Sequence, residues 1–340
     1  MLHSLAFNPS SPSFTHSTFS FLENGERYLL ENELGLALAE FSRGLIIDPN
    51  ELSLLAKRGE AYRRLGEFDL ALKDLNAVLD KLPENIFALG ERGRAYSQQF
   101  LFDQALQDVN LAIKIDQDDV FARTVRGEVY WLTDQLDLAL EDLNFVLDRD
   151  PDHIAALVVR ADIFRQQDLP NNALEDANRV LQTDHSNLLA LSVRVYAYSK
   201  LNRLNLALTD ANIVLQTDPS YNVVRSTRVE IYCIYAEFTS ALQDLDYFLR
   251  ENPELLSTRV LRGEVHRRLQ NYEKALEDMN FVLERNPNYQ IARIGRAEVY
   301  YSQMRFDDAL CEAEALLLED PENVLAKSIK MRVEGWVVVE

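Results

Sequence analysis

The sequence predicts an all-α protein built as an α-solenoid of about nine helical hairpins. Two periodic features and one absence indicate this fold. The dipeptide Ala-Leu recurs every 34 residues, at nine places from Ala37 to Ala309. An arginine recurs with the same spacing from Arg58 to Arg296, and no insertion or deletion interrupts either series. Such a period is typical of repeat proteins, whose hairpins cannot bury their own apolar face and stack on their neighbours.

The period also divides the chain. Nine tandem repeats of 34 residues account for residues 18–323. Residues 324–340 are expected to form a partial tenth helix and a C-terminal tail. Residues 1–17 are rich in Ser, Thr and Pro and contain no Asp, Glu, Lys or Arg, so we expect a disordered tail there.

The repeat at 52–85 shows why each unit should be a helical hairpin. Apolar and small residues recur at three- and four-residue steps through Gly59, which predicts a first helix, named helix A. Gly66 interrupts this run. A second amphipathic stretch, helix B, ends before Pro83, because the residue that precedes a proline resists the helical conformation.

Small residues recur where the two helices should cross. A glycine or alanine occupies the position of Gly59 in most repeats, and the alanine of each Ala-Leu pair occupies the matching place on helix B. The complete pattern, R-G-x-x-Y…A-L-x-D…P over 34 residues, resembles the tetratricopeptide repeat (TPR) family. The resemblance covers about nine-tenths of the chain. It implies a right-handed TPR superhelix of about nine helix-turn-helix repeats, with helix A lining a concave groove.

The net charge, the apolar runs and the cysteine content of the chain limit the partners and the compartment that we predict. The formal net charge of −20 argues against general binding to DNA or RNA and against docking on an anionic membrane. No apolar run approaches the roughly 20 residues that span a bilayer. Two cysteines, Cys233 and Cys311, cannot form a disulfide framework in 340 residues. These observations predict a cytoplasmic protein, with a nuclear location left open.

No motif predicts catalysis or a cofactor. The chain has no phosphate-binding glycine loop, no G-x-S-x-G turn, no H-E-x-x-H and no C-x-x-C. Its five histidines are scattered, and its carboxylates recur with the period as scaffold residues do. We therefore predict that the chain is not an enzyme by itself, and that it has neither a metal site nor a cofactor.

The periodic arginines and aspartates have two interpretations. They could form a ladder of ion pairs that joins hairpins, or a stripe that binds a partner. We favour the ladder, because a binding surface usually varies between repeats. The spacing does not decide whether Arg92 reaches Asp74 of the preceding repeat or Asp108 of its own.

The resemblance places partner binding on the helix A residues that face away from helix B. One such position is acidic in six of eight repeats, and the position one turn later carries arginines and aromatic residues. We predict a groove for an extended or helical peptide that carries Lys or Arg, with Trp131, Phe121 and Phe87 as apolar anchors. The predicted groove residues are Glu60, Arg63, Arg64, Phe87, Arg94, Phe121, Glu128, Trp131, Asp162, Arg165, Tyr196, Glu230, Glu264, Arg267, Arg268, Glu298 and Tyr301.

The function predicted from these features is that of a protein–protein interaction scaffold or adaptor, with two alternatives. A chaperone-associated TPR co-chaperone would use a carboxylate clamp of Lys and Asn, but the stretches 56–60, 90–94 and 124–128 lack both the first lysine and the asparagine of that clamp. The chain could also be the repeat region of a larger enzyme or complex subunit. The apolar stretch 336–339 predicts either self-association through the C-terminal end or a cover for the last hairpin.

Overall fold

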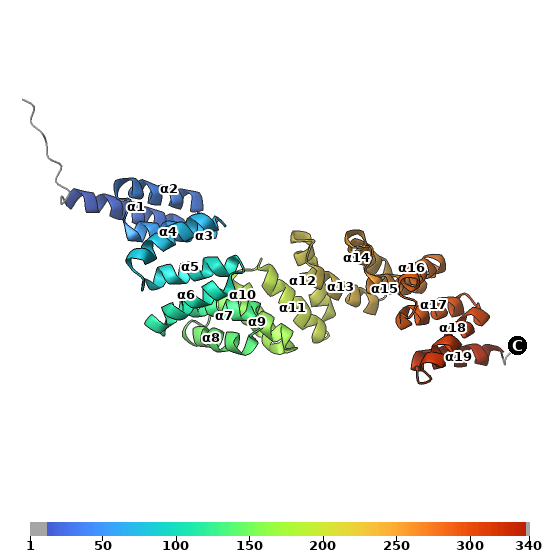
Figure 1. The fold of residues 1–340 in the computed structure, drawn as a ribbon. Helices are drawn as coiled ribbons and strands as arrows, with labels where there is room; N and C mark the ends of the chain where they lie inside the picture. The colour runs from blue at the N-terminus through green and yellow to red at the C-terminus, as the bar shows by residue number, and fades with distance from the viewer. Residues whose placement is uncertain (1–11, 338–340) are drawn as a thin grey trace, which may run out of the picture. The chain divides into compact units, whose positions relative to one another are not determined.

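Nineteen α-helices make up the part of the chain that the computed structural model describes, namely the backbone of residues 12–337. The helices follow one another as hairpins of a helix A and a helix B, and no strand occurs among these residues (Figure 1). The all-α repeat solenoid predicted by the sequence is confirmed. The helices divide between two compact units, Met1–His185 and Ser186–Glu340, which are described separately below.

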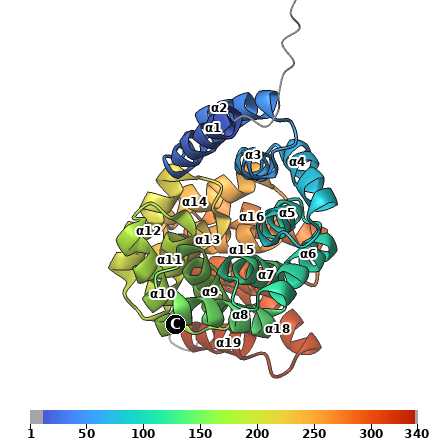
Figure 2. The same cartoon turned by 90° about the vertical axis from the view of Figure 1, so that its left-hand side faces the viewer.

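The first compact unit holds five hairpins, whose odd-numbered helices are helices A. Figure 2 shows α4 and α6, two helices B, on the outer side of α3 and α5. The helices of this unit are α1 (Pro12–Leu30), α2 (Leu34–Ile47), α3 (Leu52–Arg64), α4 (Phe68–Lys81), α5 (Ile86–Gln98), α6 (Phe102–Ile115), α7 (Val120–Leu132), α8 (Leu136–Arg149), α9 (Ile154–Gln166) and α10 (Pro170–Thr183).

The second compact unit holds four hairpins and a final unpaired helix A. Its helices are α11 (Leu188–Lys200), α12 (Leu204–Thr217), α13 (Asn222–Ile234), α14 (Phe238–Glu251), α15 (Leu256–Arg268), α16 (Tyr272–Arg285), α17 (Gln290–Ser302), α18 (Phe306–Glu319) and α19 (Val324–Val337). The backbones of α13 and α15 approach each other less closely than those of α15, α17 and α19, although Val229 of α13 and Val265 of α15 belong to one buried cluster.

Helix α1 begins earlier than the sequence predicted. It starts at Pro12, inside the segment 1–17 that was expected to be disordered. Proline favours the first position of a helix, since its φ is already helical and its missing N–H needs no partner there. The rest of that predicted tail, residues 1–11, lies outside the described residues.

The chain turns sharply between helix A and helix B of every hairpin. The residue at this turn has positive φ, and it is a glycine only at Gly66 (φ +81°) among the described residues. Non-glycine residues with φ between 55° and 61° occupy the equivalent position elsewhere: Asn32, Phe100, Asp134, Asp168, Asn202, Ala236, Gln270 and Met304. Because side chains other than glycine are strained in this conformation, these turns store strain.

Close approach of the two helices requires the small residues that the sequence singled out. A Cβ atom added to Gly59 would lie 2.8 Å from Leu75 and 3.4 Å from the carbonyl oxygen of Ala71. Ala71 is fully buried, as is the equivalent alanine of every other hairpin. Leucines and valines such as Leu75 and Val78 then fill the core between the hairpins.

Candidate interaction surface

A periodic ion pair joins the two helices of seven hairpins. In the hairpin of α3 and α4, Nε and Nη2 of Arg58 donate to the two carboxylate oxygens of Asp74, at 2.6 and 2.9 Å. The carboxylate therefore comes from the arginine's own repeat, and all seven aspartates are buried. The same pairing recurs as Arg92–Asp108, Arg126–Asp142, Arg160–Asp176, Arg194–Asp210, Arg228–Asp244 and Arg262–Asp278.

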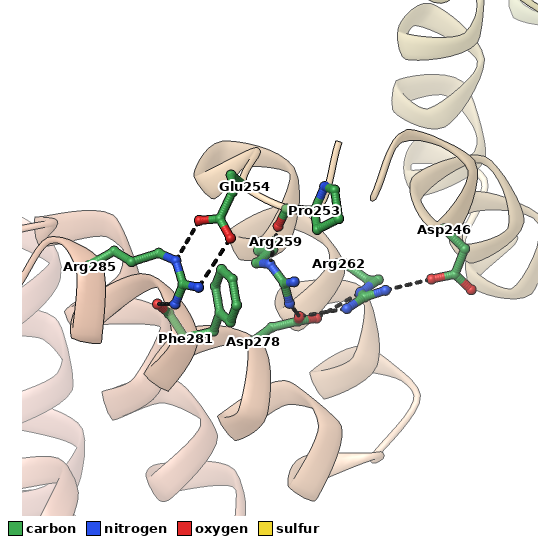
Figure 3. A network of polar contacts seen from close by, with 8 residues as sticks. All are labelled: Asp246, Pro253, Glu254, Arg259, Arg262, Asp278, Phe281 and Arg285. Atoms are coloured by element: carbon green, nitrogen blue, oxygen red, sulfur yellow. Dashed lines mark hydrogen bonds and ion pairs between the residues drawn. The ribbon is translucent and has the colours of Figure 1, made fainter. Parts of the chain in front are cut away.

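These arginines, here called the arginine ladder, also reach the preceding helix B. Nη1 of Arg92 donates to Oδ1 of Asn76 at 2.7 Å. Arg262 lies between Asp278 of its own repeat and Asp246 of the preceding one, at 2.8 Å from Asp246 (Figure 3). Since each guanidinium holds its own hairpin together and most also donate to the preceding helix B of their unit, the ladder is structural and is no free binding stripe. Equivalent bonds are Arg126–Asn110, Arg160–Asn144, Arg228–Asn212 and Arg296–Asn280.

A second arginine and an aromatic ring extend this network in some repeats. The ring of Phe281 lies between Arg259 and Arg285, each 3.4 Å from the ring centroid (Figure 3). Arg259 also donates to Asp278 at 3.2 Å and to the carbonyl oxygen of Pro253 at 2.8 Å. Arg285 binds Glu254 at 2.5 Å.

The same arrangement surrounds Phe145, with Arg123 and Arg149 at 3.6 and 3.4 Å from the ring centroid. It accounts for the Asp, Phe and Arg that residues 141–151 share with residues 277–287. This network was not predicted from the sequence. An arginine on helix A followed 22 residues later by an aromatic residue would have indicated it.

In the first compact unit, predicted groove residues bridge successive helices A. Nε of Arg63 on α3 donates to Oε2 of Glu91 on α5 at 2.5 Å. Arg94 on α5 binds Glu128 on α7. Nε1 of Trp131 on α7 donates to Oδ2 of the buried Asp162 on α9 at 3.0 Å. The structure therefore brings these residues together, but most of them form ion pairs or hydrogen bonds with one another and are not left open for a ligand.

The remaining predicted residues of the first unit also form hydrogen bonds or cation–π contacts within the chain. Glu60 accepts from Lys57 at 3.1 Å. Arg64 donates to Oδ1 of Asn32 at 2.9 Å, and Arg165 donates to Asp162 at 2.6 Å. The predicted anchors are half-buried beneath cations: Lys57 lies 4.2 Å from the ring centroid of Phe87, and Arg94 lies 5.1 Å from that of Phe121.

In the second compact unit, the predicted carboxylates Glu264 and Glu298 are paired with arginines and Glu230 is not, among the described residues. Glu264 accepts from Arg267 and Arg268, at 2.6 and 2.8 Å. Glu298 on α17 binds Arg332 on α19, whose guanidinium also lies 4.6 Å from the ring centroid of Tyr301. Lys200 lies 5.6 Å from the ring centroid of Tyr196. Glu230 is exposed and forms no ion pair with any residue that the structure describes.

Burial and pairing shift the pKa of these groups in different directions. Burial raises the pKa of Glu91, although Arg63 opposes the shift. Burial also acts against ionisation of Glu264, but the hydrogen bonds from Arg267 and Arg268 outweigh it and lower the pKa. Burial, with the charges of Glu230 and Glu264, raises the pKa of the Cys233 thiol. Most of the acidic row is thus neutralised within the chain, and Glu230 is the exception.

Exposed aliphatic side chains on the helices A of the second unit were missed by the sequence analysis. Val223, Ile291 and Leu325 occupy the second residue of α13, α17 and α19, and each is exposed. Ile234 and Leu261 are exposed further along α13 and α15. Counting in steps of 34 from Phe87 would have found the first three, because they share its register.

No group of three or more His, Cys, Asp or Glu side chains within the described residues could hold a metal ion. None of the helices described here is long and apolar enough to cross a membrane.

Comparisons with known proteins agree with this architecture. The family model for the tetratricopeptide repeat matches residues 56–120 and 260–324. Similar structures include PilF of Pseudomonas aeruginosa (TM-score 0.55, 15% identity, 64% of this chain and 99% of that one) and the type IV pilus biogenesis factor PilW (0.52, 15%, 64% and 99%). The Cut9–Hcn1 hetero-tetramer of the APC/C is also similar (0.50, 15%, 89% and 59%). No curated protein sequence matches significantly.

At 15% identity these structures bear on the fold alone. The family model matches four of the nine repeats, and the unbroken 34-residue period carries the same pattern through the others. Tetratricopeptide repeats are in general scaffolds for protein–protein interaction, without catalytic activity of their own. The chain is a tandem tetratricopeptide repeat protein.

Proposed function

We propose that the protein is an adaptor that binds a peptide segment of a partner protein on the exposed face of its helices A. The observation that carries the proposal is the presence of exposed aliphatic residues at one register of three of these helices, at Val223, Ile291 and Leu325, with Ser257 between the first two. Apolar side chains that gather on a surface mark interaction sites. The arginine ladder and the buried alanines meanwhile hold the scaffold rigid behind this face.

The charge of the ligand follows from the pairing described above. A basic peptide was expected from the acidic row, but Glu128 is bound to Arg94 and Asp162 is buried. A carboxylate that is already satisfied gains little from a second cation. The proposal of a basic ligand therefore rests on Glu230, and apolar contacts are expected to supply most of the affinity.

Exposed leucines on helices B are a competing surface. Leu36, Leu70, Leu138 and Leu206 share one register, and they are less exposed than Val223 or Ile291. Asp69 and Asp137 precede two of them directly, and such charges disfavour an apolar contact. We therefore place the binding surface on helix A.

Two further functions stay as alternatives. The co-chaperone alternative gains no support, since Glu60 and Glu128 occupy the place of the clamp asparagine. Membership of a larger assembly is favoured by one observation: the Cut9–Hcn1 structure, which is similar in fold, is a hetero-tetramer. For location we retain the cytoplasm or nucleus, because Cys233 and Cys311 are both free thiols.

Site-specific photo-crosslinking tests the proposed surface. A photoreactive amino acid would replace Val223 or Ile291 on helix A, and Leu70 or Leu206 on helix B, in cells that make the protein. We expect covalent adducts with a partner only from the helix A positions. Adducts from the helix B positions alone would contradict the proposal.

A further inference from the structure

The turns between helix A and helix B line one edge of each compact unit, here called the turn edge. In each hairpin it extends from the last three residues of helix A to the second residue of helix B. Successive helices A of a unit run in the same direction, so their C-terminal ends lie at the same edge. Hydrogen bonds join neighbouring turns there: Arg64 donates to the carbonyl oxygen of Leu29 at 3.1 Å in the first unit, and Tyr235 donates to Asn205 at 2.9 Å in the second.

One turn in each unit carries a large apolar side chain in a strained backbone conformation. Phe100 and Met304 both have φ of 60°, whereas the other described turns place Asn, Asp, Gln, Ala or Gly at this position. Phe100 is 73% exposed and Met304 74%, so neither side chain packs into the core. Strained residues persist mainly where they have a function, and an exposed apolar side chain on such a residue indicates a contact outside the chain.

Further exposed apolar side chains accompany these two residues. Every hairpin of the first unit contributes at least one large apolar side chain to the turn edge, and two hairpins of the second unit do so. The additional residues are Leu30, Leu65, Leu101, Leu132 and Leu169 in the first unit, and Ile234 and Tyr235 in the second. Both turn edges therefore offer apolar surface to a partner.

The turn edges of the two units differ in charge. Acidic residues outnumber basic ones by eight to three in the turn edge of the first unit, and basic residues outnumber acidic ones by five to three in that of the second. The residue before helix B shows the difference. It is Glu33 and Glu67 in two hairpins of the first unit, and Arg203 and Arg305 in two hairpins of the second, where Glu237 is the exception.

These four side chains before helix B are available for contact. None of them caps the helix that follows it, within the part of the chain that the structure describes. Glu33, Glu67 and Arg203 are exposed and form no ion pair with any described residue. Arg305 pairs with Asp308 three residues further on, and both side chains stay about half exposed.

The charges decide what the acidic turn edge of the first unit can meet. The same edge of a second copy would bring acidic residues together, and an anionic membrane would repel them in the same way. The turn edge of the second unit, in contrast, offers basic residues beside exposed apolar side chains. It therefore matches the edge of the first unit in both charge and apolar character.

We infer that the protein self-associates through its turn edges, with the acidic edge of the first unit in one copy against the basic edge of the second unit in another. Phe100 and Met304 supply the main apolar contacts. The net charge of −20 repels a second copy in general, so the complementary edges have to meet directly. The turn edge is distinct from the face of helices A, so this contact goes beyond the proposed function.

Sedimentation velocity of the full chain tests this contact. At about 150 mM salt the Debye length is about 8 Å, so mainly charges in direct contact act on each other. The weight-average mass should rise above that of one chain as the concentration increases from about 1 to 100 μM. Phe100→Asn and Met304→Asn should each raise the dissociation constant about fivefold, because each removes an apolar contact. Neither should lower the melting temperature, since Asn tolerates positive φ.

An exchange of charges between two variants tests how the edges pair. The first variant carries Glu33→Lys and Glu67→Lys, and the second carries Arg203→Glu and Arg305→Glu. In either variant the same sign of charge then precedes helix B in both units, so each alone should associate about tenfold more weakly than the wild type. An equimolar mixture should recover association, because every contact between unlike variants again joins Glu to Lys or Arg.

Met331→Ser is the matched control, since Met331 is 70% exposed on α19 and lies outside the turn edges. It should associate as the wild type does. A loss of association in this variant would place the contact at the C-terminal end and overturn the inference. A monomer at every concentration, unchanged association of Phe100→Asn and Met304→Asn, or a mixture that stays dissociated would each overturn it too. The photo-crosslinks from helix A judge the proposed function independently.

Discussion

Arg63 on α3 and Glu91 on α5 form an ion pair in which both side chains are more than nine-tenths buried. Nε of Arg63 lies 2.5 Å from Oε2 of Glu91, and Nη1 donates to Gln98 at 3.4 Å. The pair joins two successive helices A at the place where the sequence predicted an open groove. A charge buried in this way depends on its partner, because the solvent no longer stabilises it.

Removing one member of this pair should therefore destabilise the chain more than removing both. Arg63→Ala is expected to reduce the free energy of unfolding by about 3 kcal/mol, because it leaves Glu91 buried without a cation. The double variant Arg63→Met, Glu91→Leu should lie within about 1 kcal/mol of the wild type. Urea denaturation followed by circular dichroism measures both. A double variant less stable than Arg63→Ala would contradict this interpretation.

Glu91 and Glu264 should respond to pH in opposite ways. Burial raises the pKa of Glu91 above its ordinary 4.5. The contribution of Glu91 to the free energy of unfolding is therefore fully present below pH 4.5 and is lost as pH rises through the pKa of the folded state. The pKa of Glu264 is lowered, so its contribution is present above pH 4.5 and is lost as pH falls through the folded pKa.

Carboxyl chemical shifts followed by NMR from pH 3 to pH 8 check these directions. Glu91→Gln should gain stability relative to the wild type as pH rises above 4.5. Glu264→Gln should lose stability relative to the wild type over the acidic range. A raised pKa at both carboxyls would show that burial outweighs the hydrogen bonds from Arg267 and Arg268 at Glu264 as well.

The arginine ladder predicts a loss of stability from a single substitution. Arg160→Ala leaves the buried Asp176 without its two hydrogen bonds and should cost about 1–3 kcal/mol. Arg43→Ala is the control, since Arg43 is mostly exposed and pairs with Glu40 three residues away. Its cost should stay below about 0.5 kcal/mol. Thermal denaturation compares the two variants, and equal melting temperatures would refute a structural role for the ladder.

His266 occupies a position that holds tyrosine or phenylalanine in the other repeats from Tyr62 to Tyr300. Its Nδ1 is buried without a hydrogen-bond partner among the described residues, and burial lowers its pKa below the ordinary 6.5. Because the unfolded chain binds the proton more readily, stability should decline as pH falls below about 6.5. His266→Tyr should remove this decline and add about 1 kcal/mol. Melting temperatures at pH 7.5 and 5.5 measure both effects.

The positive φ angles at the turns predict substitutions that stabilise. Phe100 and Met304 adopt φ of 60° without the freedom of glycine, so Phe100→Gly and Met304→Gly should each add about 1 kcal/mol. Gly66→Ala should lower stability by a similar amount, because Gly66 has φ +81°. Chemical denaturation of the three variants decides whether the strain is real.

The sequence predicted the hairpins closely, because their determinants are local and periodic. Helices α3 and α4 lie within the predicted repeat 52–85, with the turn at Gly66 and the end before Pro83. The partner of each ladder arginine was not predictable, since Asp74 and Asp108 lie at similar distances along the chain from Arg92. The packing of α5 on α6 places Asp108, and not Asp74, beside the side chain of Arg92.

The positions of the predicted groove residues on the helices A could be read from the sequence, but their pairing with one another could not. Arg94 and Glu128 occupy equivalent positions 34 residues apart, and a single repeat cannot show whether such side chains face solvent or each other. The pairing depends on how closely α5 and α7 pack. Exposure of Ile291 and Leu325 likewise depends on the side chains around them, although their register was already visible in the sequence.

The arginine ladder also bears on how such a chain can change length over evolution. Arg92 takes its second acceptor from Asn76, and Arg126 takes the equivalent one from Asn110. If recombination removed residues 86–119, Arg126 would meet Asn76 in the same geometry, and no guanidinium of the arginine ladder would lose an acceptor, whereas Arg63 would lose Glu91 and Gln98. Duplication of the segment would likewise keep the acceptors of the ladder arginines. The ladder therefore tolerates the gain or loss of whole hairpins, while a deletion of any other length would break its connections between neighbouring hairpins.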